Sequence, residues 1–294
     1  MSAQFPLLKE FVAFISERWS IHTKRCAGQP SPWTKDPILR RYRFCNVRRE
    51  DDRVTQWIHK EWLLPHTHDK NVWFAMTVAR LVNLPESLHE MPNAVFAGKH
   101  VEWSPKKFTS VMNRRKGRGE KTWTSAYMIR AIEAKDGETK ADYLAKYVLN
   151  PLWAAKKQTP LKGTLQEFHT WLQSHYGMGS FLAAQVVADV KWVPPLVNAV
   201  DWETFAAPGP GSQRGLNRAM GQDLTAPWQP QEWHSALLAL RGHVLPKLPK
   251  ELRSLDAQNL QNCLCEFDKY MRTRGGEGRP RQNFNPSAEP YAAR

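Results

Sequence analysis

The fold of this chain is decided by residues 165–190, whose sequence is LQEFHTWLQSHYGMGSFLAAQVVADV. Apolar residues recur at helical spacing on both sides of Gly177 and Gly179, which predicts two helices joined by a tight turn. Glycines let the backbone of such a turn approach a phosphate, and the amides that open the second helix, at Ser180, can bind the anion. We therefore predict a helix-hairpin-helix at about 165–190 that contacts DNA without reading its sequence. An ordinary tight turn between helices has the same pattern.

Helical spacing of apolar residues extends over most of the chain, in the segments 5–19, from 36 onward, 54–64, 70–84, 142–153, 213–220, 231–240 and 256–271. Between residues 93 and 128 the apolar runs are short and flanked by Gly and Pro, so we expect loops and a small hairpin there. Strand signals are otherwise nearly absent. We predict an all-α fold with this loop and hairpin insertion, formed as a single domain over 1–274. A basic tail over 275–294 is poor in core-forming residues and is expected to be flexible.

The charge of the chain indicates a polyanionic partner. Its 294 residues include 42 Lys and Arg against 28 Asp and Glu, which gives a formal net charge of +14, and they include 13 Trp and 7 Tyr. A basic, aromatic surface suits nucleic acid better than a membrane. Basic residues gather at 40–53 and 106–121, and the second stretch supplies the expected phosphate contacts Arg114, Arg115 and Lys116. No apolar run of membrane-spanning length and no signal-peptide pattern is present, so we expect no membrane partner and a cytoplasmic location.

Asp201 is the candidate catalytic residue. It follows Gly179 by 22 residues and ends the segment Ala199-Val200-Asp201. This stretch resembles the helix-hairpin-helix DNA glycosylases, whose essential Asp lies just past the second helix in a segment of this form. The resemblance implies a glycosylase-like fold and extrusion of the target base from the duplex. Ala183 stands where bifunctional glycosylases hold a nucleophilic Lys, which argues against Schiff-base chemistry. The alternative is that Asp201 caps a helix over 202–205, and the two roles can coexist.

A Gly/Pro turn at residues 208–218, PGPGSQRGLNR, opens a helix that carries Arg214 and Arg218 one turn apart. Such a turn is suited to hold a phosphate or pyrophosphate, with contacts from Gly209, Gly211 and Ser212. A connector with solvated arginines is the alternative. Residues 117–122, GRGEKT, place Glu120 where a P-loop requires its second Gly, so we do not expect ATP to bind there.

Four separated segments carry a second resemblance: 41–49, 119–128, 208–217 and 264–270. In this order they resemble the α-glutamyl/putrescinyl-thymine pyrophosphorylase group, also described as the helical domain of 5-hydroxymethyluracil DNA kinases, over roughly residues 39 to 281. The resemblance implies a bacteriophage enzyme of thymine hypermodification in the cytoplasm of the host cell. In that pathway a kinase pyrophosphorylates hydroxymethyluracil in DNA, and a glycosylase-like partner displaces pyrophosphate with the amine of an amino acid or polyamine. Because the chain has no Walker A motif, we expect the transferase rather than the kinase.

That reaction assigns roles to the candidate residues. Asp201 is the base that keeps the attacking amine neutral, and Arg214 and Arg218 stabilise the charge of the leaving pyrophosphate. Arg43 and Arg48 are further cations that could stabilise the leaving pyrophosphate. Lys269 or Arg43 is expected to bind the carboxylate of the amino acid. Asn46 and Tyr127 are expected to read the edge of the flipped uracil or stack on it. Ordinary surface charge is the alternative for Arg43 and Lys269. We predict no protein metal site and no certain cofactor, although Mg²⁺ on the pyrophosphate is chemically plausible.

Three functions stay open at this point. The first is an amine transferase acting on activated hydroxymethyluracil in double-stranded DNA. The second is a DNA glycosylase of the same fold, in which Asp201 stabilises an oxocarbenium ion or activates water. The third is a non-catalytic DNA-binding partner of a hydroxymethyluracil DNA kinase. A shared fold and a shared Asp serve both enzymes, so only the arginine-bearing turn favours the first.

Overall fold

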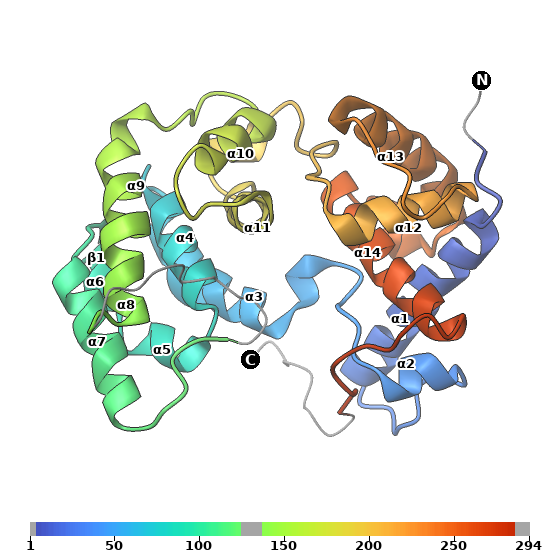
Figure 1. Ribbon diagram of the computed structural model, residues 1–294, viewed down its shortest axis with the longest axis horizontal. Coiled ribbons are helices and arrows are strands. Elements are labelled where there is room, and N and C mark those ends of the chain that lie inside the picture. The colour runs from blue at the N-terminus through green and yellow to red at the C-terminus, as the bar shows by residue number, and fades with distance from the viewer. Residues whose placement is uncertain (1–3, 125–136, 286–294) are drawn as a thin grey trace. The chain divides into compact units, whose positions relative to one another are not determined.

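The computed structural model describes residues 4–124 and 137–285 (Figure 1). Regular structure in these residues is almost entirely helical, which confirms the all-α prediction. The expected hairpin is present as β1 (Phe96–Ala97) and β2 (His100–Val101), an antiparallel pair in which Phe96 lies opposite Val101. Both strands are only two residues long, so the hairpin adds little more than the buried Phe96 and Val101 to a core that is otherwise helical.

The chain divides into two compact units. Unit 1 consists of Met1–Arg53 and Glu203–Arg294, and unit 2 consists of Val54–Trp202. Unit 2 is therefore an insertion between the two segments that build unit 1. The division into two units does not test whether residues 1–274 fold as one body, so the single domain over 1–274 stays a prediction.

Unit 1 contains five α-helices among the described residues: α1 (Leu8–Cys26), α2 (Pro37–Arg41), α12 (Pro210–Met220), α13 (Pro230–Val244) and α14 (Ala257–Arg274). Short 3-10 turns lie at Arg49–Asp51, Leu245–Lys247 and Lys250–Leu252. The apolar faces of these helices form one core that includes Phe11, Ile15, Trp233, Leu264 and Phe267. The rings of Phe11 and Phe267 are 5.0 Å apart, so the first and last helices of the unit are packed directly on each other.

Helices α12 and α14 approach each other closely because α12 carries glycines on the contact face. A Cβ at Gly215 would lie 2.1 Å from the carbonyl oxygen of Leu264, and a Cβ at Gly211 would lie 2.5 Å from Sγ of Cys265. Both distances are shorter than van der Waals contact, so neither position accommodates a side chain without movement of α14.

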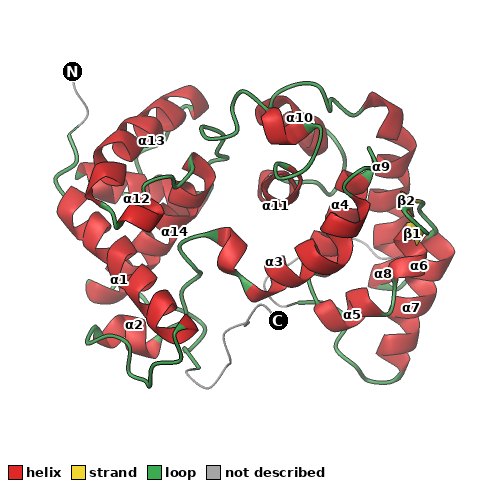
Figure 2. Cartoon of the chain, turned by 180° about the vertical axis from the view of Figure 1, so that it is seen from behind, coloured by secondary structure: helices red, strands yellow, loops and turns green. Residues whose placement is uncertain are grey.

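Unit 2 contains nine α-helices in its described part: α3 (Arg53–Ile58), α4 (Val72–Val82), α5 (Pro85–His89), α6 (Pro92–Val95), α7 (Pro105–Gly117), α8 (Lys140–Tyr143), α9 (Asn150–Ala154), α10 (Leu165–Gln173) and α11 (Ser180–Val190). π-helical turns at His59–Leu63 and Leu144–Leu149 and 3-10 turns at Leu64–His66, Ala155–Gln158 and Leu196–Asn198 extend several of them. Every residue of α4 is buried, and in both views α4 lies between α11 and α9 (Figure 2). It is therefore the central helix of this unit.

Helix α7 corrects the prediction of loops over residues 93–128. Ser104 is its N-cap and Pro105 its first residue, which is a strong start signal. Phe108, Val111 and Met112 lie on one buried face at helical spacing. The prediction was wrong here because the many Lys and Arg residues around this stripe hide its amphipathic period.

The segment that follows α14 is attached to the chain near α2. The N–H of Arg43 donates to the carbonyl of Gln282 at 3.0 Å, and the N–H of Phe284 donates to the carbonyl of Arg41 at 2.9 Å. Tyr42 and Asn283 form an isolated antiparallel bridge between these bonds. The described part of the tail is thus irregular but paired, and the flexibility expected for 275–294 stays a prediction.

Candidate functional site

Helices α10 and α11 flank the Gly177–Gly179 turn, as the sequence predicts. Helix α10 starts with a capping box, in which Thr164 accepts from the N–H of Glu167 at 3.0 Å and Glu167 accepts from the N–H of Thr164 at 2.8 Å. Gly177 has a φ of +80°, and a Cβ there would lie 2.6 Å from a methyl of Val148. The turn therefore requires glycine at this position.

Gly179 differs from Gly177, because no protein atom would lie within 4 Å of a Cβ at this position. It is the N-cap of α11, ahead of Ser180, and it is exposed. The large side chains of Tyr176 and Phe181 on either side are also exposed, at 60% and 58%. The backbone at Gly179 is thus open to an approaching ligand, and exposed aromatic residues flank it in the sequence.

Asp201 lies at the N-terminus of α10. Its carboxylate accepts from the N–H of Leu165 at 2.8 Å and from the N–H of Gln166 at 2.9 Å, one on each oxygen. Asp201 therefore caps a helix, but the helix is α10 and not the one expected over 202–205, since residues 201–204 form a turn. Whether the same carboxylate also acts in a reaction stays a prediction.

Arg214 and Arg218 converge on Asp268 of α14. Nε of Arg214 lies 3.0 Å from Oδ2 of Asp268, and Nε of Arg218 lies 2.9 Å from Oδ1. Both terminal nitrogens of Arg218 also donate to Glu277. Burial lowers the pKa of Arg218, but its bonds to Glu277 and Asp268 together raise that pKa by more than burial lowers it. The net shift is therefore upward.

The two arginines differ in exposure. The side chain of Arg218 is 9% exposed and that of Arg214 is 38% exposed. The alternative of solvated arginines is therefore wrong for Arg218, which is a buried ion-pair residue. The terminal nitrogens of Arg214 have no hydrogen bond to any described residue, so Arg214 is the member of the pair that can reach an anion.

The Gly/Pro turn forms the start of α12. The Ser212 hydroxyl donates to the carbonyl of Gly209 at 3.0 Å and accepts from its N–H at 3.0 Å, and Ser212 is buried. Gly211 faces Cys265, as described above. Local closure of the helix and packing on α14 thus account for Gly211 and Ser212, whereas Gly209 has no protein atom within 4 Å of a Cβ.

Four candidate substrate contacts, Arg43, Asn46, Arg48 and Lys269, lie in unit 1, and the side chains of the last three have partners there. The Asn46 amide donates to the carbonyl of Asp51, and Arg48 makes two bonds to the Asp51 carboxylate at 3.0 and 3.1 Å. Nζ of Lys269 lies 2.6 Å from Glu266 and 3.1 Å from the carbonyl of Arg43. The exposed side chain of Arg43 is the one available to a substrate.

The predicted phosphate contacts of α7 are divided in the same way. Arg114, Arg115 and Arg118 all bond to Glu90, and hydrogen bonds from Arg118, then Arg114 and Arg115, lower the pKa of Glu90 to about 2. Arg115 is buried at 7% exposure. Lys116 is exposed and has no ion-pair partner among the described residues. Of the predicted contacts Arg114, Arg115 and Lys116, it is therefore the best placed to bind phosphate.

A buried network in unit 2 was not predicted from the sequence. Asp189 is fully buried on α11, and Arg80 of α4 donates to both of its oxygens, at 2.6 and 2.5 Å. Nε2 of His59 lies 3.0 Å from Oδ1 of the same carboxylate. The sequence did contain a signal for this network. Arg80 and Asp189 are the single charged residues of α4 and α11, and a charged residue in such an apolar helix is buried only when it is paired.

Two kinds of site are not found in the described residues. No group of three or more His, Cys, Asp and Glu side chains there could hold a metal ion. No helix of residues 4–124 or 137–285 is long and apolar enough to cross a membrane.

Comparison with known proteins decides the family. Residues 5–279 match the family model of the 5-hmdU DNA kinase, helical domain. The chain belongs to this family. A relative, the 5-hmdU DNA kinase of Bacillus phage SP10, is 25% identical over an alignment 277 residues long that covers 86% of this chain and 43% of the relative. The chain thus spans less than half the length of that kinase, and no solved structure matches it.

The match to the 5-hmdU DNA kinase helical domain begins and ends in unit 1 and includes the whole of unit 2. The candidates of this helical domain therefore fall into two sets. Unit 2 carries Gly177, Gly179, Ser180, Asp201, Arg114, Arg115 and Lys116, and unit 1 carries Gly209, Gly211, Ser212, Arg214, Arg218, Arg43, Asn46, Arg48 and Lys269. Tyr127 lies outside the described residues.

Proposed function

We propose that this helical domain transfers an amine to pyrophosphorylated 5-hydroxymethyluracil in DNA. The observation that carries the proposal is the match of residues 5–279 to the helical domain of the 5-hmdU DNA kinase, which supports a role at this modified base. The domain contains no Walker A motif, so we assign to it the step that follows phosphorylation rather than phosphorylation itself.

The reaction forms one bond and breaks another at the exocyclic methylene carbon of the base. The neutral amine attacks that carbon, the C–O bond breaks, and pyrophosphate leaves with the electron pair. The amine nitrogen then loses a proton, for which Asp201 is the proposed acceptor. Its carboxylate is held by two backbone N–H groups of α10, so it is positioned before the substrate binds.

The leaving group requires cations whose orientation is fixed in advance. Arg214 is the proposed ligand of the pyrophosphate, because Asp268 fixes its Nε while its terminal nitrogens stay available. Arg218 has a different role in this proposal. It is buried between Asp268 and Glu277, so it positions Asp268 and does not itself contact the substrate.

DNA is held by unit 2 in this proposal. The open backbone at Gly179 and Ser180 contacts phosphate, and the exposed Lys116 adds to the attraction. The exposed rings of Tyr176 and Phe181 offer stacking surface next to that backbone. Affinity should fall steeply as salt is raised, since phosphate contacts release counterions.

The test compares a duplex that contains pyrophosphorylated hydroxymethyluracil with the plain hydroxymethyluracil duplex, each incubated with the protein and a mixture of amino acids and polyamines. Mass spectrometry of the nucleosides should show an amine adduct, with released pyrophosphate, only from the pyrophosphorylated duplex. Abasic sites without an adduct would identify a glycosylase instead. Tight binding to both duplexes with no product would identify a DNA-binding partner of a kinase.

A further inference from the structure

Two segments of unit 1 that are far apart in the sequence lie side by side at the end of α2. The N–H of Arg43 donates to the carbonyl of Gln282 at 3.0 Å. The N–H of Phe284 donates to the carbonyl of Arg41 at 2.9 Å. Arg281 directly precedes Gln282, so this pairing brings it next to the other two arginines. We call Arg41, Arg43 and Arg281 together the α2 surface.

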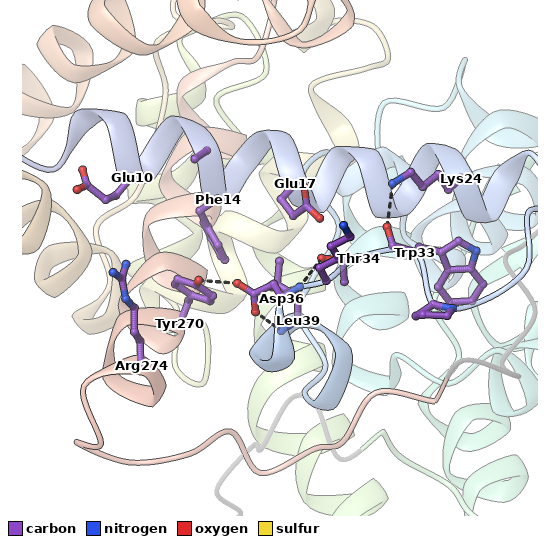
Figure 3. Close-up of a pocket in the computed structure, with 13 residues that line it drawn as sticks. Glu10, Phe14, Glu17, Lys24, Trp33, Thr34, Asp36, Leu39, Tyr270 and Arg274 are labelled. Atoms are coloured by element: carbon purple, nitrogen blue, oxygen red, sulfur yellow. Dashed lines mark hydrogen bonds between the residues drawn. The ribbon is translucent and has the colours of Figure 1, made fainter.

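A fourth arginine attaches the segment after α14 to helix α1. The guanidinium of Arg25 lies 5.2 Å from the centre of the Phe284 ring and 5.4 Å from that of Trp33, and the two rings are 6.1 Å apart. Trp33 also lines a pocket of about 800 Å³, where its carbonyl accepts from Nζ of Lys24 at 2.9 Å (Figure 3). Cation–π attraction to both rings therefore holds Phe284, and the segment that carries it, against the end of α1.

Within residues 4–124 and 137–285, no carboxylate pairs with the α2 surface. Arg41, Arg43 and Arg281 are exposed, and none of them forms an ion pair with a residue of these ranges. The carboxylates of Asp36 and Glu277, which flank these arginines in the sequence, are bonded to other side chains. The arginines of α7 differ in this respect, because a single carboxylate accepts bonds from three of them.

Positive charge gathered in this way favours an anion from outside the protein. Burial and the positive charge of Arg43 lower the pKa of Arg25, so these two guanidinium groups are close enough to repel each other. Bound phosphate relieves such repulsion, and the planar guanidinium suits phosphate oxygens. The exposed arginines come from two paired segments and not from one enclosed cavity. They therefore suit a row of phosphates better than a single compact anion.

We propose that the α2 surface binds the phosphate backbone of duplex DNA, and that the segment after α14 must be paired with the end of α2 for this binding. The surface contacts phosphates and not base edges, so it holds DNA of any sequence. This contact goes beyond the function proposed above, in which unit 2 alone holds the duplex. The choice of DNA as the source of the phosphates rests on that proposed function.

The experiment measures binding of the whole chain to a plain duplex and to a hydroxymethyluracil duplex over a series of salt concentrations. Arg43→Gln and Arg281→Gln should each remove one phosphate contact. The slope of log affinity against log salt concentration should then become shallower by about 0.9, and affinity near 0.15 M salt should fall about fivefold, equally on both duplexes.

Two further variants separate the assembly of the surface from its charge. Phe284→Ala removes no charge but removes the ring that lies against Arg25, so it should also weaken binding and make the slope shallower. Arg253→Gln is the matched control, because Arg253 is an exposed arginine of unit 1 that precedes α14, whereas Arg281 follows it. It should leave affinity and slope unchanged. Thermal melting checks that every variant is folded.

Wild-type affinity and slope in both arginine variants would overturn the proposal, and full affinity in Phe284→Ala would reject the part played by the segment after α14. Inorganic pyrophosphate is titrated by calorimetry as a compact anion. If the arginine variants lost binding of pyrophosphate but not of DNA, the surface would belong to such an anion instead.

The proposed function fails separately from this surface. Weaker DNA binding by the variants, with no amine adduct on pyrophosphorylated DNA, would keep the surface and reject the transferase. An adduct formed by the wild type, with unchanged DNA affinity in all three variants, would keep the transferase and reject the surface.

Discussion

Two clusters in this molecule each gather three arginines around one central carboxylate, in different surroundings. In unit 1, Asp268 bonds to Arg214 and Arg218 and lies 3.7 Å from Arg272. In unit 2, Glu90 bonds to Arg114, Arg115 and Arg118, which lie one turn apart or less along α7 and its end. The carboxylate side chain is 2% exposed at Asp268 and 25% exposed at Glu90.

This difference teaches how arginines in a sequence should be interpreted. Both clusters contain arginines that were predicted to contact phosphate: Arg214 and Arg218 because they lie one helical turn apart, and Arg114 and Arg115 because they lie in a basic stretch. In each cluster, a carboxylate from a separate segment already uses some of the N–H groups with which the arginines could bind a phosphate. Burial then decides how much each carboxylate contributes to stability, since a buried charge without a partner is far more costly than an exposed one.

The largest expected effect is that of Asp268→Asn. The substitution leaves the buried guanidinium of Arg218 without its charged partner on α14, so unfolding free energy should fall by about 3–5 kcal/mol. Chemical denaturation measures it, with Glu251→Gln as a surface control. An unchanged midpoint would mean that Glu277 alone satisfies Arg218, and the contrast between the clusters would be lost.

The second prediction separates the two arginines that share Asp268. Arg214→Ala should reduce turnover by an amount on the order of 2–4 kcal/mol of transition-state stabilisation, with little loss of stability, because its side chain is partly exposed. Arg218→Ala should lower the unfolding midpoint instead. Turnover is measured on pyrophosphorylated hydroxymethyluracil DNA and stability by thermal melting. Equal effects of both variants on both properties would contradict separate roles.

The third prediction concerns the close approach of helices that brings these arginines to Asp268. Gly215→Ala places a methyl against the backbone of Leu264, so it should destabilise the protein by about 1–3 kcal/mol. Gly242→Ala is the matched control, since it lies in α13 with no atom within 4 Å of its Cβ. There the better helix propensity of Ala should stabilise by up to about 1 kcal/mol. A neutral result at Gly215 would contradict the packing argument.

The two clusters also show what the sequence could predict. Amphipathic spacing and paired glycines located α10, α11 and the turn between them, because these signals are local. Partners of the charged residues were not predictable in this way. Asp268 is 54 residues from Arg214, and Asp201 caps a helix that begins 36 residues earlier, so both contacts depend on the tertiary fold. Helix α7 was missed because its basic residues obscure its buried stripe.

The fourth prediction tests Asp201, whose carboxylate, like those of the two clusters, is held by a separate segment. Asp201→Asn removes the negative charge at the start of α10, which should reduce stability by about 1 kcal/mol, while turnover is abolished and DNA binding is kept. Activity, melting temperature and affinity are measured on one preparation. Retained turnover would leave Asp201 as a cap alone.

The smallest effect is expected for Glu90→Gln, and it should depend on pH. The pKa of Glu90 is lowered from 4.5 to about 2 in the folded protein, chiefly by hydrogen bonds from Arg118. A carboxylate with a lowered pKa contributes its stability above the unfolded value and loses it as the pH falls toward the folded value. Wild type should therefore be slightly more stable than the variant near neutral pH, and this difference should shrink as the pH falls from 4.5 to about 2. Urea unfolding of both proteins above and within that range measures the difference. A difference that stays constant across the range would mean that the charge of Glu90 contributes nothing, and that the exposed cluster, unlike the buried one, is not held together by its carboxylate.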